Sequence, residues 1–389
     1  MISFDNTEIA FKSKSDKDLK KAYWLFKIVG NPSMVKMGKT MTNFSLKAKL
    51  PIKGIIKNTI FHQFCGGETI PDCANTIKQL GDFGIGTILD YSIEGKTSEE
   101  DFDATVKEIV ATIQEAKNSK HIPFGVFKVT GISRFEILEK ANPENANLSD
   151  SEQKELQAVI NRVDIICKAG FDAGIPVFID AEETWIQETI DRIAVDMMVK
   201  YNKEKAIVFT TAQMYRHDRY EYLKKEISKA KEQNYHFGIK LVRGAYMEKE
   251  RERAEKLNYP SPIQPNKEST DKDFDLALEL LINSIDTISL CAGTHNEESS
   301  QFLTELLEKK GIQKDDKRVF FAQLLGMSDH ISYNLSYNHY NVAKYVPYGP
   351  IEEVLPYLLR RADENTSVAG QTSRELNLIM KERNRRKEN

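Results

Sequence analysis

The sequence predicts an α/β protein built around a (βα)8 barrel of the TIM type, distorted in shape and preceded by a helical extension. From residue 84 onward, short runs rich in β-branched and aromatic residues alternate with longer helical stretches. Eight such runs occur over roughly 260 residues, close to the ~250 residues of a typical barrel. Strands that alternate with helices form parallel βαβ units, and a polar side chain ends or follows nearly every run.

The predicted strands define a barrel domain, residues 84–389. They are Gly86–Asp90, Phe124–Val129, Ile175–Ile179, Ala206–Phe209, Phe237–Val242, Thr287–Cys291, Arg318–Phe321 and Val342–Val346. The alternative is a doubly wound open sheet, which usually has fewer strands and, where it binds a dinucleotide, a glycine-rich first turn. The glycines from Gly81 to Gly86 lack the G-x-G-x-x-G spacing, and no strand precedes them. The barrel is therefore preferred.

Residues 1–83 are predicted to form the helical extension. The expected helices are Lys17–Val29, Leu46–Phe64 and Asp72–Leu80, of which the second is weakened by Pro51 and Gly54. At the other end of the chain, the basic run Lys381–Lys387 predicts a frayed and solvated helix end.

Composition excludes several classes of protein. A formal net charge of −3 gives no sign of nucleic-acid binding, and no apolar run reaches membrane-spanning length. The N-terminus lacks the pattern of a signal peptide. Four scattered cysteines fit free thiols in a reducing compartment, and no HExxH or paired histidines predict a metal site. We expect a cytoplasmic protein without a metal.

The polar residues at the strand ends are expected to meet, because barrel active sites lie at the carboxyl ends of the strands. They are Lys128, Asp180 with Glu182 and Glu183, Gln213, Arg243, Thr294, His295, Asn296, Gln323 and Tyr345. Any single one is more often a structural loop contact. Lys128 and Asp180 end neighbouring strands and can pair, either to fix an amine or to hold other side chains in place.

A helix at residues 357–365 supplies the second group of candidates. Tyr357, Arg360, Arg361 and Glu364 fall at i, i+3, i+4 and i+7, so they share one helix face. Two adjacent arginines form a fork suited to a carboxylate. The alternative is a solvated charged face. A helix that begins at Pro350 would be kinked by Pro356, whereas one that begins at Pro356 would hold it in the first turn.

The segment after the fifth predicted strand suits a flat anionic cofactor. Gly244 and Ala245 remove bulk just where Arg243 ends the strand, and Gln213 and His295 end other strands. A tight turn with ordinary surface charges is the alternative. Tyr246, with the tyrosines already named and Leu324-Leu325, can supply apolar walls for a small amino acid. No activated serine or cysteine nucleophile is evident, which favours redox chemistry carried by a cofactor.

These residues resemble the proline dehydrogenase family. The segments YLLRRADEN and KLVRGAYM are similar to its C-terminal helix and flavin-binding strand, and agreement continues in order through FKVTG, FIDAEET, TAQMY, GTHN, QLLGM and KYVPYGP. The likeness covers roughly residues 84–370 and is nearest to the monofunctional, eukaryote-like branch, with no room for an aldehyde dehydrogenase domain.

The resemblance implies a role for each matching residue. Arg360 and Arg361 would bind the proline carboxylate, with Glu364 supporting an arginine. The substrate pocket would be lined by Lys128, Asp180, Tyr246, Tyr345, Tyr357 and Leu324, with Leu325 competing for the last contact. FAD would be held by Gln213, Lys240, Val242, Arg243, Gly244, Ala245, Thr270, Thr294, His295, Asn296 and Gln323. Lys240 stands where many bacterial members have arginine, so a cation is kept but its bidentate fork is lost.

The implied activity is FAD-dependent oxidation of L-proline to Δ1-pyrroline-5-carboxylate, with the electrons passed to a quinone. Peripheral contact with the inner face of a membrane is a further implication, and the oligomeric state stays open. One alternative is a hydroxyproline dehydrogenase; in the family, a small residue in place of Tyr345 accompanies that preference. Another is a flavin-free barrel that binds a small amino acid.

Overall fold

The computed structural model of the 389-residue chain describes residues 2–31, 33, 34, 36, 54, 57–92, 97–367 and 371–388. The side chains of Val29, Asn58 and residues 361–373 lie outside this description. Most of the expected helix Leu46–Phe64 also lies outside it. Within the described residues, Lys57–Phe61 is π-helical and His62–Phe64 continues as the short helix α5.

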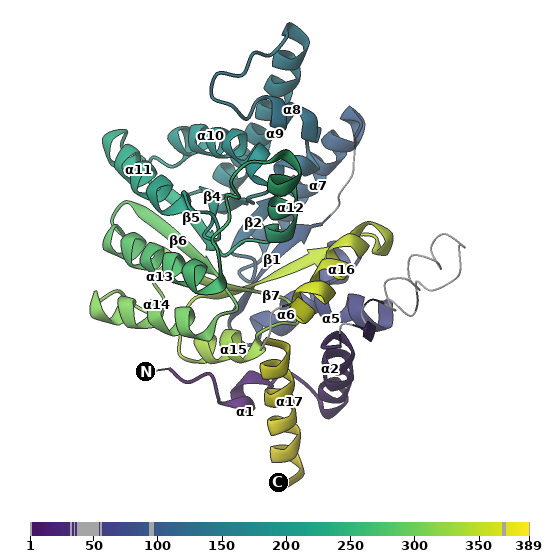
Figure 1. The fold of residues 1–389 in the computed structure, drawn as a ribbon. Coiled ribbons are helices and arrows are strands. Elements are labelled where there is room, and N and C mark those ends of the chain that lie inside the picture. Colours follow the sequence, from purple (N-terminus) through teal and green to yellow (C-terminus); the bar gives the residue numbers. More distant parts are fainter. Residues whose placement is uncertain are drawn as a thin grey trace. The chain divides into compact units, whose positions relative to one another are not determined.

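Eight parallel strands in the described chain close into a barrel in the order β1 to β8, which confirms the predicted fold class (Figure 1). They are β1 (Ile85–Tyr91), β2 (Phe124–Phe127), β3 (Val177–Ile179), β4 (Val208–Gln213), β5 (Phe237–Val242), β6 (Ile288–Gly293), β7 (Val319–Leu324) and β8 (Val342–Tyr348). Helices separate the successive strands in the chain, as βαβ units require.

The expected helices Lys17–Val29 and Asp72–Leu80 correspond closely to α2 and α6. The described helices are α1 (Thr7–Ala10), α2 (Asp16–Val29), α5 (His62–Phe64), α6 (Ala74–Gly81), α7 (Glu99–Asn118), α8 (Phe135–Lys140), α9 (Asp150–Ala173), α10 (Thr184–Tyr201), α11 (Arg219–Glu232), α12 (Met247–Leu257), α13 (Lys267–Asn283), α14 (Glu297–Lys309), α15 (Asp329–Tyr337), α16 (Ile351–Ser367) and α17 (Gln371–Glu388). Ser15 caps α2 through a reciprocal bond with Asp18, and Ser149 caps α9 in the same way. None of these helices is long and apolar enough to cross a membrane.

The described residues divide into two compact units. The first holds Glu94–Ala322, and the second holds Ile2–Ile93 together with Gln323–Asn389. In the first unit, β2 to β6 and most of β7 pair in parallel, and α13 lies beside α14. In the second, β1 pairs with β8 along its whole length. The expected boundary between residues 1–83 and 84–389 stays a prediction.

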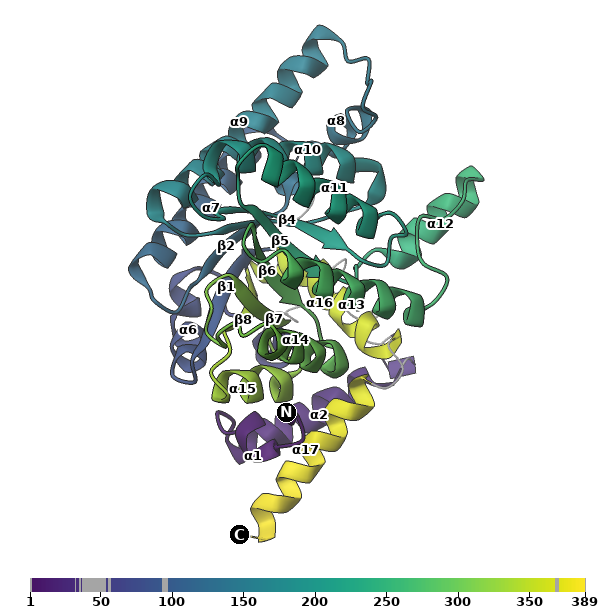
Figure 2. The ribbon, with the colours of Figure 1, turned by 90° about the vertical axis from the view of Figure 1, so that its left-hand side faces the viewer.

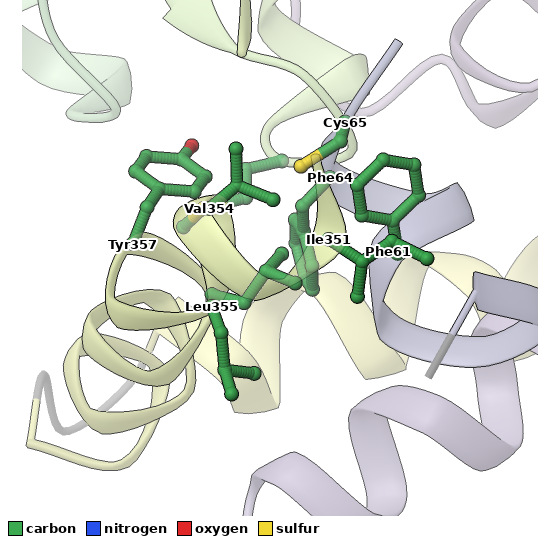
Figure 3. Packing of buried hydrophobic residues seen from close by; sticks show 9 residues of the cluster. Phe61, Phe64, Cys65, Ile351, Val354, Leu355 and Tyr357 are labelled. Atoms are coloured by element: carbon green, nitrogen blue, oxygen red, sulfur yellow. The ribbon is translucent and has the colours of Figure 1, made fainter. Parts of the chain in front are cut away.

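Helix α16 begins at Ile351, directly after Pro350, so Pro356 lies inside it. Pro356 has no N–H to donate to the carbonyl of Glu352, which leaves one gap in the helical ladder. Ile351, Val354 and Leu355 nevertheless bury one face of α16 against Phe61, Phe64 and Cys65 (Figure 3). Tyr357 belongs to the same cluster, and its hydroxyl points away from the phenylalanine rings.

The C-terminal helix α17 packs beside α1 and α2 in both views of the ribbon (Figures 1 and 2). Leu378 and Ile379 are buried with Phe11, Leu19 and Phe26. The basic end of α17 is not frayed, contrary to expectation. The fully buried carboxylate of Glu382 pairs with Arg385 and Arg386, and Arg386 also donates to the carbonyls of Phe11 and Lys14.

Candidate active site

Two lysines and an aspartate form a cluster in the first unit, in which Asp180 and Lys240 are buried and Lys128 is partly exposed. Asp180 follows β3, and its Oδ2 lies 3.4 Å from the Nζ of Lys128, the residue after β2. Its Oδ1 accepts a hydrogen bond from Lys240 of β5, whose Nζ also lies 5.5 Å from the ring centre of Phe178. Burial opposes ionisation of Asp180, but Lys240 and Lys128 hold its pKa below the ordinary value. The predicted Lys128–Asp180 pair is therefore present, and Lys240 forms a second ion pair with the same carboxylate.

Glu182 fixes the turn that carries Lys128. Its Oε1 accepts the N–H of Thr130 at 3.1 Å, and its Oε2 accepts the Thr130 hydroxyl. These bonds hold the short 3-10 turn Val129–Gly131, which directly follows Lys128. Burial raises the pKa of Glu182 to about 7, although the bonds from Thr130 oppose the shift. The geometry thus links the ends of β2 and β3 through a carboxyl group that titrates near neutrality.

Glu182 also gives a prediction for stability against pH. Its pKa is 4.5 ordinarily and about 7 when folded, so the native state holds the proton more tightly. The resulting stability is fully present below pH 4.5 and is lost as pH rises to about 7. The loss should reach about 3 kcal/mol, at 1.36 kcal/mol per unit. In Glu182→Gln this loss should disappear from urea unfolding curves measured across that range.

The exposed Glu252 of α12 provides the control. Glu252→Gln should keep the pH dependence of the wild type. A Glu182→Gln protein that loses stability with pH as steeply as the wild type would show that another group is responsible.

The end of β5 exposes a stretch of backbone that is fixed from two sides. Gln213, the last residue of β4, donates to the carbonyl of Glu182 at 2.7 Å and accepts the N–H of Ala245 at 3.3 Å. Gly244 has φ of 130°, and a Cβ there would lie 2.5 Å from the ring of Tyr215. Only glycine can adopt this φ and also avoid contact with the tyrosine ring. Glycine is therefore required at position 244, and Gly244 and Ala245 are both exposed at this strand end.

Arg243 is held by partners on several elements. Its guanidinium donates to Asp271 of α13 at 2.6 Å, to the Thr294 hydroxyl at 2.6 Å and to the Ser299 hydroxyl at 2.9 Å. It also lies 4.4 Å from the ring centre of Phe274. These contacts fix the cation beside the exposed backbone of the β5 end.

The remaining cofactor candidates of the first unit lie close to this arginine. Asn296 caps α14 by accepting the N–H of Ser299 at 2.9 Å, and its own N–H donates to Thr294 at 3.1 Å. His295, between them, is partly exposed, as are Val242 and Tyr246. Thr270 is buried, and its hydroxyl donates to the carbonyl of Asn266.

The second unit carries the other candidates. Gln323 is buried and accepts the hydroxyl of Ser332 at 2.8 Å. The side chains of Leu324, Leu325 and Arg360 are partly buried, whereas Tyr345 and Tyr357 are buried. The backbone of Arg361 and Glu364 belongs to α16, but their side chains lie outside the described residues.

A second buried lysine was not among the residues predicted from the sequence. Lys344 lies in the middle of β8 with its Nζ 2.9 Å from Asp329 Oδ1. Burial lowers the pKa of Lys344, although Asp329 opposes the shift. A lysine inside the apolar run VAKYV was the available signal, because a charge within a strand interior requires a partner.

Eight βα units with polar residues at their strand ends and a Lys–Asp–Lys cluster around a buried aspartate define a (βα)8-barrel enzyme. The profile of the family "Proline dehydrogenase" matches residues 73–374. The chain belongs to the proline dehydrogenase family. It is thus an oxidoreductase of proline catabolism, and the family implies a flavin cofactor.

Individual relatives agree with this assignment. "Proline dehydrogenase 1, mitochondrial" of Dictyostelium discoideum is 34% identical over 98% of this chain and 74% of its own length. "Hydroxyproline dehydrogenase" of Xenopus laevis is 29% identical over 99% and 90% of the two chains. The crystal structure of proline utilization A from Bdellovibrio bacteriovorus shares the fold, with a TM-score of 0.74 at 20% identity. The match covers 93% of this chain but 38% of that one.

Proposed function

We propose that the protein oxidises L-proline to Δ1-pyrroline-5-carboxylate with FAD as cofactor and passes the electrons to a quinone. The observation that carries the proposal is the Lys128–Asp180–Lys240 cluster, with Asp180 and Lys240 buried, in the barrel of a proline dehydrogenase family member. A buried acid held between two cations is costly unless it is paired, and such groups concentrate at functional sites.

The residues around β5 fit a flavin. Lys240 and Arg243 offer cations, the Gly244-Ala245 backbone is exposed, and Gln213 is anchored by hydrogen bonds. We propose that the cofactor is held by these residues and by Val242, Thr270, Thr294, His295, Asn296 and Gln323. When bound, FAD supplies the acceptor for the hydride of the substrate. Arg243 would contact the anionic part of FAD without rearrangement, because the guanidinium of Arg243 is already held in place.

The substrate carboxylate is assigned to the arginines of α16. Arg360 and Arg361 are adjacent in a helix whose first turns are anchored by buried Ile351 and Val354. A guanidinium matches a carboxylate in shape and charge. We assign Glu364 to the support of an arginine, and Tyr246, Tyr345, Tyr357 and Leu324 to the apolar lining.

Lys128 has a defined electrostatic task in this proposal. Oxidation removes a hydride from C5, the ring carbon next to nitrogen that does not carry the carboxylate. This step requires the nitrogen lone pair and hence a neutral amine. A cation near that nitrogen disfavours the protonated amine, so Lys128 would lower the pKa of bound proline. Asp180 is itself ionised and positions Lys128. The amine proton would leave to solvent before the hydride is transferred.

Hydroxyproline is the second candidate substrate, because a relative named for that activity aligns over 99% of this chain. The buried phenol of Tyr345 argues for proline, since a bulky ring would crowd a hydroxyl on the substrate. In a dye-reduction assay, kcat/KM for proline should exceed that for hydroxyproline at least about tenfold, as expected for steric rejection worth 1.4 kcal/mol or more. Equal values, or a preference for hydroxyproline, would contradict the assignment.

A peripheral membrane contact is also part of the proposal. Lys17, Lys20, Lys21, Trp24 and Ile28 lie on one face of α2, with Trp24 52% and Ile28 41% exposed. Exposed aromatic and aliphatic groups beside lysines suit an anionic lipid surface. Sedimentation with phosphatidylserine vesicles, but not with neutral ones, would support this contact. The cytoplasmic location stays a prediction, and several relatives carry "mitochondrial" in their names.

A further inference from the structure

The turn between β7 and α15 has a demanding backbone. Gly326 has φ of 74°, and a Cβ at this position would collide with the carbonyl oxygen of Gln63. Two residues later, Ser328 has φ of 51°, in the left-handed region that residues other than glycine rarely adopt. The turn directly follows Gln323 and Leu324, the proposed cofactor and substrate contacts. Neighbouring groups must hold this conformation, because the local sequence does not favour it.

One side of the turn is held by β8. The Nζ of buried Lys344 donates to the carbonyl of Met327 at 2.5 Å and to that of Leu324 at 3.3 Å. The same ammonium group pairs with Asp329, the first residue of α15. In addition, the N–H of Leu325 donates to the carbonyl of Tyr345 at 2.8 Å. These bonds connect the turn to the last strand.

The other side is held by the C-terminal helix α17. Glu375 is buried, and its Oε1 accepts the N–H of Ser328 at 2.6 Å. Its Oε2 lies 3.2 Å from Nδ1 of buried His330. The carboxylate of Glu375 thus contacts both Ser328 and His330 in the first turn of α15. It therefore stabilises the unfavourable left-handed backbone conformation of Ser328. A hydrogen bond to a charged acceptor is roughly twice as strong as one between neutral groups.

We propose that Glu375 is a positioning residue for substrate binding, acting through the β7–α15 turn on Leu324. This role rests on the proposed oxidation of proline. Because the contact comes from α17, which packs beside α1 and α2, the terminal elements of the chain are coupled to the substrate-contacting end of β7. Gln323 is held separately by Ser332, so flavin binding depends less on Glu375 than proline binding does.

Three variants test this role. Glu375→Ala removes both bonds, whereas Glu375→Gln keeps an acceptor for the N–H of Ser328 and is expected to retain much of the function. Glu382→Ala is the matched control, because Glu382 is equally part of α17 and buried but pairs with Arg385 and Arg386. Glu375→Ala should raise KM for proline about tenfold, as loss of one charge-assisted bond allows. Flavin content and kcat should stay within about twofold of the wild type.

Hydrogen exchange in the peptide that contains Ser328 gives a second readout that does not depend on activity. Faster exchange in Glu375→Ala, with an intermediate rate in Glu375→Gln and a wild-type rate in Glu382→Ala, would support the proposal. Unchanged exchange and KM in Glu375→Ala would overturn it, as would equal effects in Glu382→Ala. If Glu375→Ala does not fold, KM and hydrogen exchange are measured in Glu375→Gln, where smaller changes in the same direction are expected. A wild type that oxidises no proline would refute the proposed function, and exchange alone would then decide whether Glu375 holds the turn.

Discussion

Replacing Asp180 by asparagine is expected to destabilise the protein and nearly abolish proline oxidation. Asp180 is buried and pairs with both Lys128 and Lys240, so its replacement removes the carboxylate that lies between the two cations. Removing one partner of a buried ion pair lowers the free energy of unfolding by about 3–5 kcal/mol. The activity of the remaining folded protein should fall by roughly 10²–10³-fold, as when a preorganised electrostatic group is removed.

Asp191 offers a matched control for the loss of a buried carboxylate. It lies in α10 and pairs with Arg219 at 2.8 Å, and Gln187 and Thr210 also donate to it. Asp191→Asn should therefore lose stability as well but keep its kcat/KM per folded molecule. Urea unfolding gives the folded fraction for each variant. Equal losses of specific activity in Asp180→Asn and Asp191→Asn would show that Asp180 is only structural.

Arg360→Ala should raise KM for proline by about 10- to 150-fold, the equivalent of the 1.5–3 kcal/mol that a hydrogen bond to a charged group contributes. Flavin occupancy should be unaffected, because Arg360 is assigned to the carboxylate and not to the cofactor. Steady-state kinetics combined with the absorbance ratio of flavin to protein separates the two effects. Arg361→Ala should act in the same direction.

Arg318→Ala controls for the general loss of an arginine. Arg318 precedes β7 at its amino end and pairs with Asp316 at 2.7 Å, away from the carboxyl ends of the strands. The KM of the Arg318→Ala protein for proline should equal that of the wild type. An Arg360→Ala protein with normal KM but depleted flavin would show that the arginine serves the cofactor.

The sequence predicts strands well where apolar runs are unbroken. β5 is predicted to the residue, because Phe237–Val242 is apolar apart from Lys240. β4 is predicted to end at Phe209 but continues to Gln213. The hydroxyls of Thr210 and Thr211 find partners inside the fold, on Asp191 and on the carbonyl of Ile179, so polar residues extend the strand. β2 is shorter than expected because the turn Val129–Gly131 takes its last residue.

The candidate site is predictable where it follows strand ends and is missed where distant segments meet. Lys128 and Asp180 are paired as the sequence suggests, since neighbouring parallel strands end at one edge. The contact of Glu375 with Ser328 cannot be predicted, because α17 is charged around most of its surface and lacks a clear apolar stripe. The same holds for the last turns of α17, where buried Glu382 pairs with two arginines that sequence alone predicts to be solvated.

The most direct test of the proposed function is the absorbance spectrum of the purified protein during anaerobic addition of L-proline. The bands of bound oxidised flavin are expected before the addition, and they should bleach afterwards and recover when a soluble quinone is added. The Asp180→Asn protein should retain the bands and bleach far more slowly. A preparation that binds no added FAD, or one whose spectrum proline leaves unchanged, would contradict the account.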